Sequence, residues 1–253
     1  MRPGSLLGPG ELRRDPYIRA AEEATAEGGF GPLYLVGGYL RDLLLGRTRA
    51  GRIDLDLVIW GEPQAFGRAV AKTFDGTLYP IDLETVRVLG RHGGILIRMD
   101  ISRPKGETIE LDLAARDFTV NALAVRIDRL LSDTAAAIVD PSDGLNDLKR
   151  RCLRALSPSA FDRDPLRLIR AVRLAGELNF TIEEGTRHAI IDRAPFLTSV
   201  AGERLRDELF RILGMLPVAP SIECLDTLRL LGVLVPEVEA LKSVPASPPH
   251  RLP

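Results

Sequence analysis

The chain contains 253 residues, of which 45% are apolar and 27% charged, a balance typical of one large or two ordinary globular domains. Its formal net charge of −1 gives no global reason to expect a polyanionic partner, and its two cysteines, Cys152 and Cys224, exclude a disulfide scaffold and a zinc cluster. No apolar run approaches the length of about 18 residues that a membrane span requires, and residues 1–14 lack the apolar core of a signal peptide, so we expect a cytoplasmic protein without a membrane partner.

The part of the chain before residue 150 predicts alternating strands and helices. Short apolar runs bounded by Gly, Pro and Asp are typical of strands. They occur at Leu33–Val36, Leu55–Trp60, Ile95–Ile101 and Ile109–Leu113. Two helices are predicted between them, a short one after Gly38 and a longer one from Gln64 to Phe74.

The pattern after residue 150 is helical almost throughout. Apolar residues recur at helical spacing in Asp164–Leu178, Ile182–Ala194, Ala201–Leu213 and Ser221–Leu231. The final stretch, residues 243–253, is rich in proline and is interpreted as a linker to a further domain. The predicted fold class is therefore α+β, with an N-terminal segment and helix (1–30), a head with a small mixed sheet and flanking helices (31–148), and an all-helical neck (149–242).

A pair of glycines follows the first predicted strand, in the run Gly37-Gly38-Tyr39-Leu40-Arg41-Asp42. Glycine at a strand-to-helix turn lets the backbone approach a ligand closely, and the free N–H groups of the next helix attract an anion. Arg41 adds a guanidinium that can bind phosphate at two points. Taken alone, such a turn favours a structural loop over a phosphate site.

Two aspartates, Asp54 and Asp56, stand at the start of the next apolar strand. Residues two apart on a strand point to the same face, so we expect the two carboxylates side by side. Like charges held that close repel each other, and a divalent cation relieves this repulsion. A pair of such ions can activate an attacking hydroxyl group and stabilise a departing pyrophosphate. An isolated pair of this kind is more often two solvated residues at a strand end.

Four motifs in this order resemble those of the class II CCA-adding enzymes and bacterial poly(A) polymerases, within the DNA polymerase β-like nucleotidyltransferase superfamily. The first two are the glycine turn and the Asp54–Asp56 pair. The third is Leu113-Ala114-Ala115-Arg116-Asp117-Phe118-Thr119-Val120-Asn121-Ala122, and the fourth runs from Arg163 to Arg173. The resemblance covers about residues 34–213. It implies a polymerase β-like nucleotidyltransferase head followed by a helical neck.

The resemblance also implies roles for the residues that match these motifs. Asp54 and Asp56 would bind two Mg²⁺ ions and carry the catalysis. The nucleotide-binding residues that it implies are Gly37, Gly38, Arg41, Asp42, Arg116, Asp117, Asn121, Asp164, Arg167, Arg170 and Arg173. A further matching segment, which leads into the neck, contains Asp140, Pro141, Gly144, Asp147 and Leu148. A third metal-binding carboxylate is expected on a neighbouring strand, with Asp100 as the first candidate and Asp112 as the second.

The fourth motif indicates how a base can be selected without a nucleic-acid template. On one helix, Asp164 and Arg167 would share a face, since residues three apart are neighbours. A carboxylate that accepts and a guanidinium that donates hydrogen bonds can together match the Watson–Crick edge of a base. A wrong base would leave buried polar groups unpaired. Without the other motifs, the same residues would be read as an ion pair at a helix N-terminus, with Arg170 and Arg173 on a solvated face.

Basic residues are concentrated around this fourth motif. Between Lys149 and Arg173 there are eight Lys and Arg residues and two acidic ones, Asp162 and Asp164. Such a stripe can follow RNA phosphates even in a nearly neutral protein, although a solvated helix face has the same pattern. We therefore expect the neck arginines to position the triphosphate and to guide the RNA backbone.

The chain departs from the family pattern at three places. Ala115 stands where the third motif usually has the first of two arginines, and Arg163 stands where the fourth usually has glutamate. The stretch Ser102–Glu107 is short, whereas CCA-adding enzymes commonly carry there a long flexible loop that switches specificity from CTP to ATP. A short loop is a feature of CC-adding members, so it favours CC addition and leaves CCA addition open.

The expected function is template-independent transfer of C, A or both, from CTP and ATP, to the 3′ end of RNA. The expected RNA is tRNA, and pyrophosphate is the second product. Poly(A) synthesis is the alternative within the same enzyme class. The alternative from another class is an RNA-binding protein on a catalytically decayed scaffold, against which the presence of both metal-binding aspartates argues. The sequence does not indicate an oligomeric state.

Overall fold

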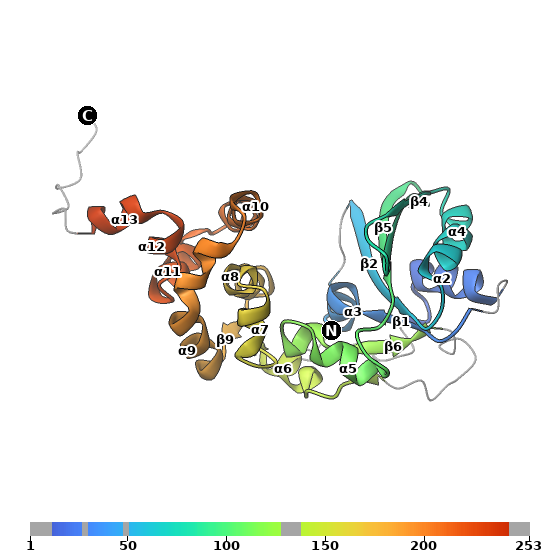
Figure 1. Ribbon diagram of the computed structural model, residues 1–253, viewed down its shortest axis with the longest axis horizontal. Coiled ribbons are helices and arrows are strands. Elements are labelled where there is room, and N and C mark those ends of the chain that lie inside the picture. The colour runs from blue at the N-terminus through green and yellow to red at the C-terminus, as the bar shows by residue number, and fades with distance from the viewer. Residues whose placement is uncertain (1–11, 27–29, 48–50, 128–137, 243–253) are drawn as a thin grey trace. The chain divides into compact units, whose positions relative to one another are not determined.

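The computed structural model describes residues 12–26, 30–47, 51–127 and 138–242 (Figure 1). The chain divides into two compact units, Met1–Arg150 and Arg151–Pro253, which we call the head and the neck. The predicted linker at 243–253 and the first part of the predicted N-terminal segment lie outside the described residues. No helix in the described part of the chain is both long and apolar enough to cross a membrane.

The described residues of the head form a seven-stranded mixed sheet with the strand order β3-β4-β5-β2-β1-β6-β7. Its strands are β1 (Leu33–Val36), β2 (Arg52–Ile59), β3 (Thr77–Pro80), β4 (Thr85–His92), β5 (Ile95–Ser102), β6 (Ala124–Arg126) and β7 (Ile138–Val139). β2 and β5 pair in parallel, and the other neighbours in this sheet pair antiparallel. The predicted strands at 33–36, 55–60 and 95–101 are confirmed as β1, β2 and β5, whereas the other four strands were not predicted.

Helices flank this sheet. They are α2 (Pro16–Ala26), α3 (Gly37–Leu44), α4 (Pro63–Thr73), α5 (Ile109–Ala114), the 3-10 turn η1 (Thr119–Asn121) and α6 (Gly144–Arg150). Figure 1 shows α2 and α4 on one side of β2, β4 and β5. A Cβ atom on Gly67 of α4 would lie 2.5 Å from Leu78 Cδ1 and 3.0 Å from Val86 Cγ2, so glycine allows this close approach. The opposite face of these strands carries the polar residues.

The prediction of a strand at Ile109–Leu113 is wrong, because this segment forms the helix α5. Its alternation of apolar and polar residues is typical of a strand, but five residues are too few to separate that pattern from a helical one. The Thr108 hydroxyl accepts a hydrogen bond from the Leu111 N–H at 3.4 Å, and acidic residues in the first turn complement the helix dipole. In the helix, Ile109 and Leu113 are buried, whereas Leu111 is 53% exposed.

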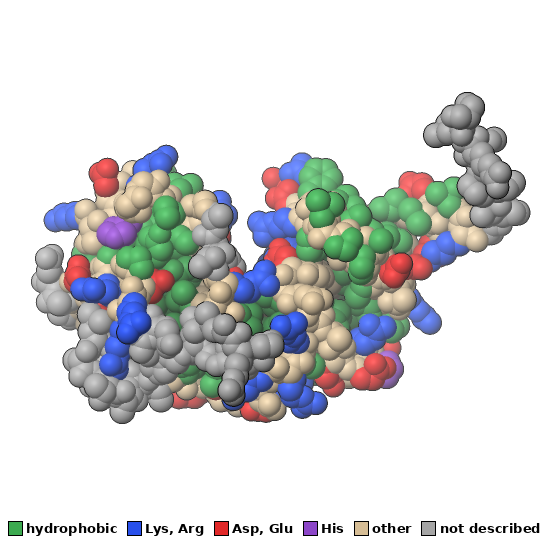
Figure 2. Space-filling model, turned by 180° about the vertical axis from the view of Figure 1, so that it is seen from behind, with side chains coloured by type: hydrophobic (Ala, Val, Ile, Leu, Met, Phe, Trp, Pro, Cys, Tyr) green, Lys and Arg blue, Asp and Glu red, His purple; other side chains and the backbone are tan. Residues whose placement is uncertain are grey.

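The described residues of the neck are helical apart from a short parallel pair, β8 (Cys152–Leu153) with β9 (Thr181–Ile182), so within them the prediction of an all-helical neck is correct except for this pair. Its helices are α7 (Ser159–Arg163), α8 (Leu166–Leu178), α9 (Glu184–Arg193), the 3-10 helix η3 (Ala194–Ser199), α10 (Gly202–Leu213), α11 (Ala219–Thr227), α12 (Leu231–Leu234) and α13 (Pro236–Leu241). The amphipathic α8 packs against α10 and α11. Some apolar residues stay at the surface, where Figure 2 shows apolar side chains on the neck and Phe210 of α10 is 62% exposed.

The helix predicted from Asp164 to Leu178 begins two residues later, at Leu166. Asp164 has an extended backbone, with φ −148° and ψ 94°, and follows the last residue of α7. The physical reason is Pro165, whose ring disfavours a helical conformation in the residue before it. Asp164 is therefore in the link between α7 and α8.

Candidate active site

Asp54, Asp56 and Asp100 lie on one face of the head sheet. Asp54 and Asp56 are two apart on β2, and the intervening Leu55 is buried on the opposite face. In the parallel pair of β2 and β5, Asp56 is the register partner of Asp100, and Asp54 is that of Arg98. Residues that are register partners project to the same side of a sheet. The three carboxylates thus stand on the face opposite to the one that α4 covers.

The glycine turn lies directly against Asp56. Gly37 has φ +77°, a backbone conformation that favours glycine. A Cβ atom at this position would lie 2.8 Å from Asp56 Oδ2 and 3.4 Å from Arg116 Nη1. Gly38 is the second residue of α3, so the turn leads straight into a helix N-terminus. Because Gly37 has no side chain, Asp56 and Arg116 can both lie close to the turn.

The surroundings of Asp56 disfavour its charged form. Burial raises the pKa of Asp56, and the negative charges of Asp100 and Asp54 raise it further. The positive charges of Arg116 and Arg98 oppose this rise without cancelling it. A divalent cation among these carboxylates would offset both the burial and the repulsion, so the donor set fits a hard cation.

Arginines accompany the other two carboxylates of this face. The Nε atoms of Arg52 and Arg98 each lie 3.0 Å from Asp54 Oδ1. Arg87 of β4 donates to both oxygens of Asp100, from Nε to Oδ1 at 2.7 Å and from Nη2 to Oδ2 at 2.9 Å. This hydrogen bonding raises the pKa of Arg87. None of the three arginines was predicted, although their alternation with apolar residues along each strand was a usable signal.

A third metal ligand stays a prediction. Within the described ranges, no three His, Cys, Asp or Glu side chains are placed to hold one ion together. Both oxygens of Asp100 accept hydrogen bonds from Arg87, which would compete with a metal ion shared with Asp56. Asp112, the second candidate, lies on the helix α5 and accepts hydrogen bonds from the Lys105 N–H at 3.0 Å and from Arg116 Nη2 at 3.0 Å. Asp112 therefore holds Arg116 beside the glycine turn.

The other head residues of the predicted nucleotide site form a buried network. Arg41 is 3% exposed, and it donates from Nη1 to Asn121 Oδ1 at 2.7 Å and from Nε to Asp42 Oδ1 at 2.9 Å. Asn121 Nδ2 donates in turn to Asp117 Oδ1 at 3.0 Å, which also accepts the Phe118 N–H at 2.8 Å. The network ties α3 to η1. These contacts of Arg41 are with protein groups, whereas the sequence predicted a phosphate contact.

The segment before the neck is held by two more aspartates. Asp140 accepts hydrogen bonds from the N–H groups of Gly144 at 2.7 Å and Leu145 at 2.9 Å, at the start of α6. Asp147 Oδ2 accepts one from Thr119 Oγ1 at 2.6 Å. The contacts of Asp140 satisfy N–H groups at the start of α6, and that of Asp147 ties α6 to η1, which gives this motif a structural role within the head.

In the neck, the prediction that Asp164 and Arg167 share a helix face is wrong, because Asp164 precedes α8. Arg167 is in the first turn of α8, and its Nη1 donates to the Ala160 carbonyl oxygen at 3.3 Å. Arg204 of α10 reaches Asp164, with Nη2 at 3.3 Å from both carboxylate oxygens. A residue of α10 therefore orients Asp164, a contact that no sequence motif indicated.

Arg170 and Arg173 are both paired with Glu208 of α10, which was not predicted either. Glu208 is 5% exposed and forms ion pairs with Arg173 and, at 3.5 Å between Nε and Oε1, with Arg170. Arg173 also pairs with Glu177 at 2.8 Å. Burial lowers the pKa of Arg173, but the charges of Glu177 and Glu208 outweigh burial and raise it. A triphosphate would have to compete with these carboxylates for the two arginines.

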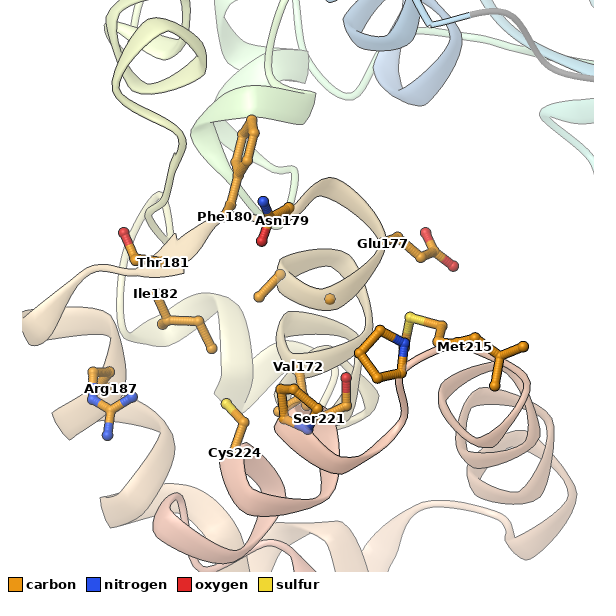
Figure 3. Close-up of a pocket in the computed structure, with 15 residues that line it drawn as sticks. Val172, Glu177, Asn179, Phe180, Thr181, Ile182, Arg187, Met215, Ser221 and Cys224 are labelled. Carbon is orange, nitrogen blue, oxygen red and sulfur yellow. The ribbon is translucent and has the colours of Figure 1, made fainter.

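A cavity of about 680 Å³ lies in the neck among the end of α8, β9 and α11 (Figure 3). Apolar residues such as Val172 and Met215 line it together with Glu177, Arg187 and Cys224. Burial raises the pKa of the Cys224 thiol, and Arg187 opposes this rise only in part. Val172 of the fourth motif lines this cavity, whereas Asp164, Arg167, Arg170 and Arg173, the residues of that motif predicted to bind the nucleotide, do not.

Two family models match the chain. The model of the poly A polymerase head domain matches residues 33–154, and a model described as the probable RNA and SrmB-binding site of polymerase A matches residues 179–242. The CC-adding tRNA nucleotidyltransferase of Geobacter sulfurreducens is 43% identical over 209 residues, which are 82% of this chain and 46% of that protein. The A-adding tRNA nucleotidyltransferase of Deinococcus radiodurans is 39% identical over 211 residues, which are 81% of this chain and 45% of that protein.

A solved structure agrees with these matches. The Thermotoga maritima CCA-adding enzyme complexed with tRNA_CCA is similar with a TM-score of 0.76 and 31% identity, over 91% of this chain and 54% of that one. The chain thus spans about half the length of the relatives it matches. The first family model includes the Asp54–Asp56 pair and the second includes Glu208.

Proposed function

The chain belongs to the family of class II CCA-adding enzymes and bacterial poly(A) polymerases, and from this premise we propose that it transfers nucleotides from CTP, ATP or both to the 3′ end of tRNA. Pyrophosphate is the second product. The observation that carries the proposal is the placement of Asp54 and Asp56 on one sheet face, against the glycine turn. Relatives that add CC, A or CCA support tRNA as the acceptor.

The residues of this site fit a reaction that depends on Mg²⁺. Asp54 and Asp56 would hold the metal, because carboxylate oxygens are the ligands that this hard cation takes in phosphoryl-transfer sites. When bound, the metal activates the attacking 3′-hydroxyl group and neutralises charge on the departing pyrophosphate. The surroundings of Asp56 disfavour an uncompensated negative charge, which supports its role as a ligand.

Arg116 is proposed to contact the triphosphate at the glycine turn. Its side chain is 23% exposed, and its Nη1 faces the position of the missing Gly37 side chain. The pair with Asp112 holds the guanidinium there and reduces the conformational entropy lost when a phosphate binds. Arg41 would act indirectly, by holding Asn121 and the η1 turn in place. In the neck, Asp164 and Arg167 are proposed to read the base.

Within this reaction class we propose CC addition. The segment between β5 and α5 is short, and it is tied down by the Arg103–Glu62 ion pair and by the hydrogen bond from the Lys105 N–H to Asp112 at 3.0 Å. The family's CCA-adding members commonly carry at this point a long flexible loop that switches specificity from CTP to ATP. A short segment with these contacts is poorly suited to that role. The CC-adding relative from Geobacter sulfurreducens supports the same choice.

The proposal is tested with tRNA transcripts that lack CCA, CA or only the final A, each incubated with one nucleoside triphosphate and Mg²⁺. For CC addition we expect CTP to extend the first two transcripts and ATP to extend none. ATP incorporation on tRNA ending in CC would refute CC-only addition and favour CCA or A addition. Extension of unstructured RNA by A alone would favour a poly(A) polymerase.

Loss of the proposed catalytic residues provides the control for this assay. Asp54→Ala and Asp56→Ala are each expected to remove incorporation, whereas Glu23→Gln, at an exposed acidic residue of α2 in the same unit, is expected to retain it. Binding of tRNA without any incorporation, even with Mn²⁺, would contradict the enzyme and favour an RNA-binding protein on a decayed scaffold. A short RNA hairpin with the same 3′ end serves as a second substrate, which tests catalysis independently of binding to the rest of the tRNA.

A further inference from the structure

The sheet face that carries the aspartates also carries exposed apolar and basic residues. We call Tyr79 of β3, Leu89 and Arg91 of β4 and Leu96 of β5 the open-face patch. Arg91 and Leu96 are register partners, and Leu89 is the next residue on the same face of β4. Tyr79, Leu89 and Leu96 are 46%, 36% and 40% exposed. Exposed strand positions are usually polar, so this adjacent set of apolar side chains is a candidate contact surface.

Two arginines connect the open-face patch to the aspartates. The register partner of Leu89 is Arg98, which forms an ion pair with Asp54 at 3.0 Å. The register partner of Tyr79 is Arg87, which forms an ion pair with Asp100 of β5. Tyr79 and Asp56 are in the same cross-strand row, on strands three positions apart in the sheet. With strands about 4.8 Å apart, this row spans about 14 Å.

The residue types of this surface fit single-stranded nucleic acid. Aromatic and aliphatic side chains contact the faces of bases, which are accessible only where the bases are unstacked from a duplex. Arginines bind the phosphates between those bases. A duplex would present mainly its backbone and shallow groove to such a face, and the apolar residues would then have no partner.

We propose that the open-face patch binds the single-stranded 3′-terminal segment of the RNA substrate, with bases on its apolar side chains and a phosphate on Arg91. This rests on the proposed function, because the 3′ end of that strand would lie at Asp54 and Asp56. The neck was expected to supply the arginines that guide the RNA backbone, but Arg170 and Arg173 are paired with carboxylates. The head sheet thus supplies a second set of contacts, on the same face as the aspartates.

The proposal is tested with a fluorescein-labelled single-stranded RNA of about ten nucleotides, whose binding to the 253-residue chain is measured by fluorescence anisotropy at several salt concentrations. Tyr79→Ala is expected to weaken binding about 5- to 20-fold, and Tyr79→Phe to stay within about twofold, because stacking needs the ring and not the hydroxyl group. Arg91→Ala is expected to weaken binding and to reduce the slope of log affinity against log salt by about 0.7, the value for one phosphate contact.

Arg68→Ala is the matched control, since Arg68 is an exposed arginine of α4, which covers the other face of the sheet. We expect it to bind like the unchanged chain. Unchanged binding by both Tyr79→Ala and Arg91→Ala would overturn the proposal, and so would an equal loss in Arg68→Ala. Equal competition by a blunt RNA duplex would overturn the preference for a single strand.

Nucleotide incorporation separates this proposal from the proposed function. Tyr79→Ala and Arg91→Ala are expected to raise the KM for RNA about 5- to 20-fold and to leave kcat within about twofold, because the patch holds the RNA away from the reacting atoms. If the unchanged chain incorporates nucleotides and both variants keep its KM for RNA, the patch proposal fails alone. If the unchanged chain incorporates nothing, the proposed function fails, and the anisotropy measurement still decides whether the patch binds RNA.

Discussion

Gly37→Ala tests the contact on which the active-site geometry depends. The added methyl group would lie 2.8 Å from Asp56 Oδ2, and the backbone has φ +77°. A left-handed conformation costs a non-glycine residue about 1–2 kcal/mol. Forcing an extra methyl group into a packed site costs a further ~1–3 kcal/mol. We therefore expect Gly37→Ala to lower the free energy of unfolding of the head by ~2–5 kcal/mol.

Gly94→Ala separates these two costs. Gly94 has φ +81°, nearly the value at Gly37, but a Cβ atom there would meet nothing within 4 Å. Gly94→Ala should therefore carry the backbone cost of about 1–2 kcal/mol alone. The difference between the two variants measures the contact between the residue at 37 and Asp56.

Both variants are measured by urea denaturation, followed by the fluorescence of Trp60, the single tryptophan, which lies in the head. Single-nucleotide incorporation is then measured without urea. Gly37→Ala is expected to slow incorporation about 100-fold, because a shift of roughly 1 Å in a catalytic group has an effect of that size. Gly94→Ala is expected to keep the rate. Equal stability and equal incorporation in the two variants would refute the reasoning.

Three further predictions concern Asp56 and the neck. Asp56→Asn is expected to abolish incorporation but to stabilise the head by ~0.5–2 kcal/mol at pH 7. Burial raises the folded-state pKa of Asp56 above its unfolded-state pKa, so the folded chain loses stability as the pH rises from the unfolded-state pKa to the folded-state pKa. Below about pH 4 the carboxyl group is protonated in both states, and urea titrations should then show no gain in stability from Asn. Glu208→Gln removes the charge of a buried carboxylate and leaves the half-buried Arg173 with Glu177 as its charged partner, and circular dichroism in urea is expected to show a loss of about 2–4 kcal/mol in the neck. Arg204→Ala removes the arginine that pairs with Asp164; because the Arg204 side chain is 53% exposed, the free energy of unfolding should change by less than about 1 kcal/mol. The ratio of correct to incorrect nucleotide incorporation should fall roughly fivefold, because Asp164 loses the residue that orients it.

Each of these predictions has an outcome that contradicts it. An Asp56→Asn variant less stable than the unchanged chain at pH 7 would show that the carboxylate is stabilising there. Glu208→Gln with the same stability as Glu223→Gln, an exposed glutamate of α11, would show that the buried ion pairs are energetically neutral. Unchanged nucleotide selection in Arg204→Ala would show that Asp164 needs no orienting residue from α10.

The parts of the fold that could be predicted are those with local signals. The apolar runs of β1, β2 and β5 predicted strands, and the spacing of Asp54 and Asp56 placed both on one face because side chains alternate along a strand. The five-residue run Ile109–Leu113 gave a wrong prediction of a strand, since alternation over so short a run also fits a helix with Leu111 exposed. The apolar spacing predicts a helix from Asp164, but the following proline disfavours a helical backbone at that residue, and α8 begins at Leu166.

The sequence by itself determined the family, the order of head and neck, and the identity of the residues most directly tied to chemistry, because motifs are local patterns of residue types. Only the tertiary structure decided which side chains meet. The parallel pairing of β2 with β5 brings Asp100 opposite Asp56, and the packing of α8 against α10 brings Glu208 to Arg173. Register and helix packing result from contacts between segments distant in sequence, and no pattern within either segment encodes them.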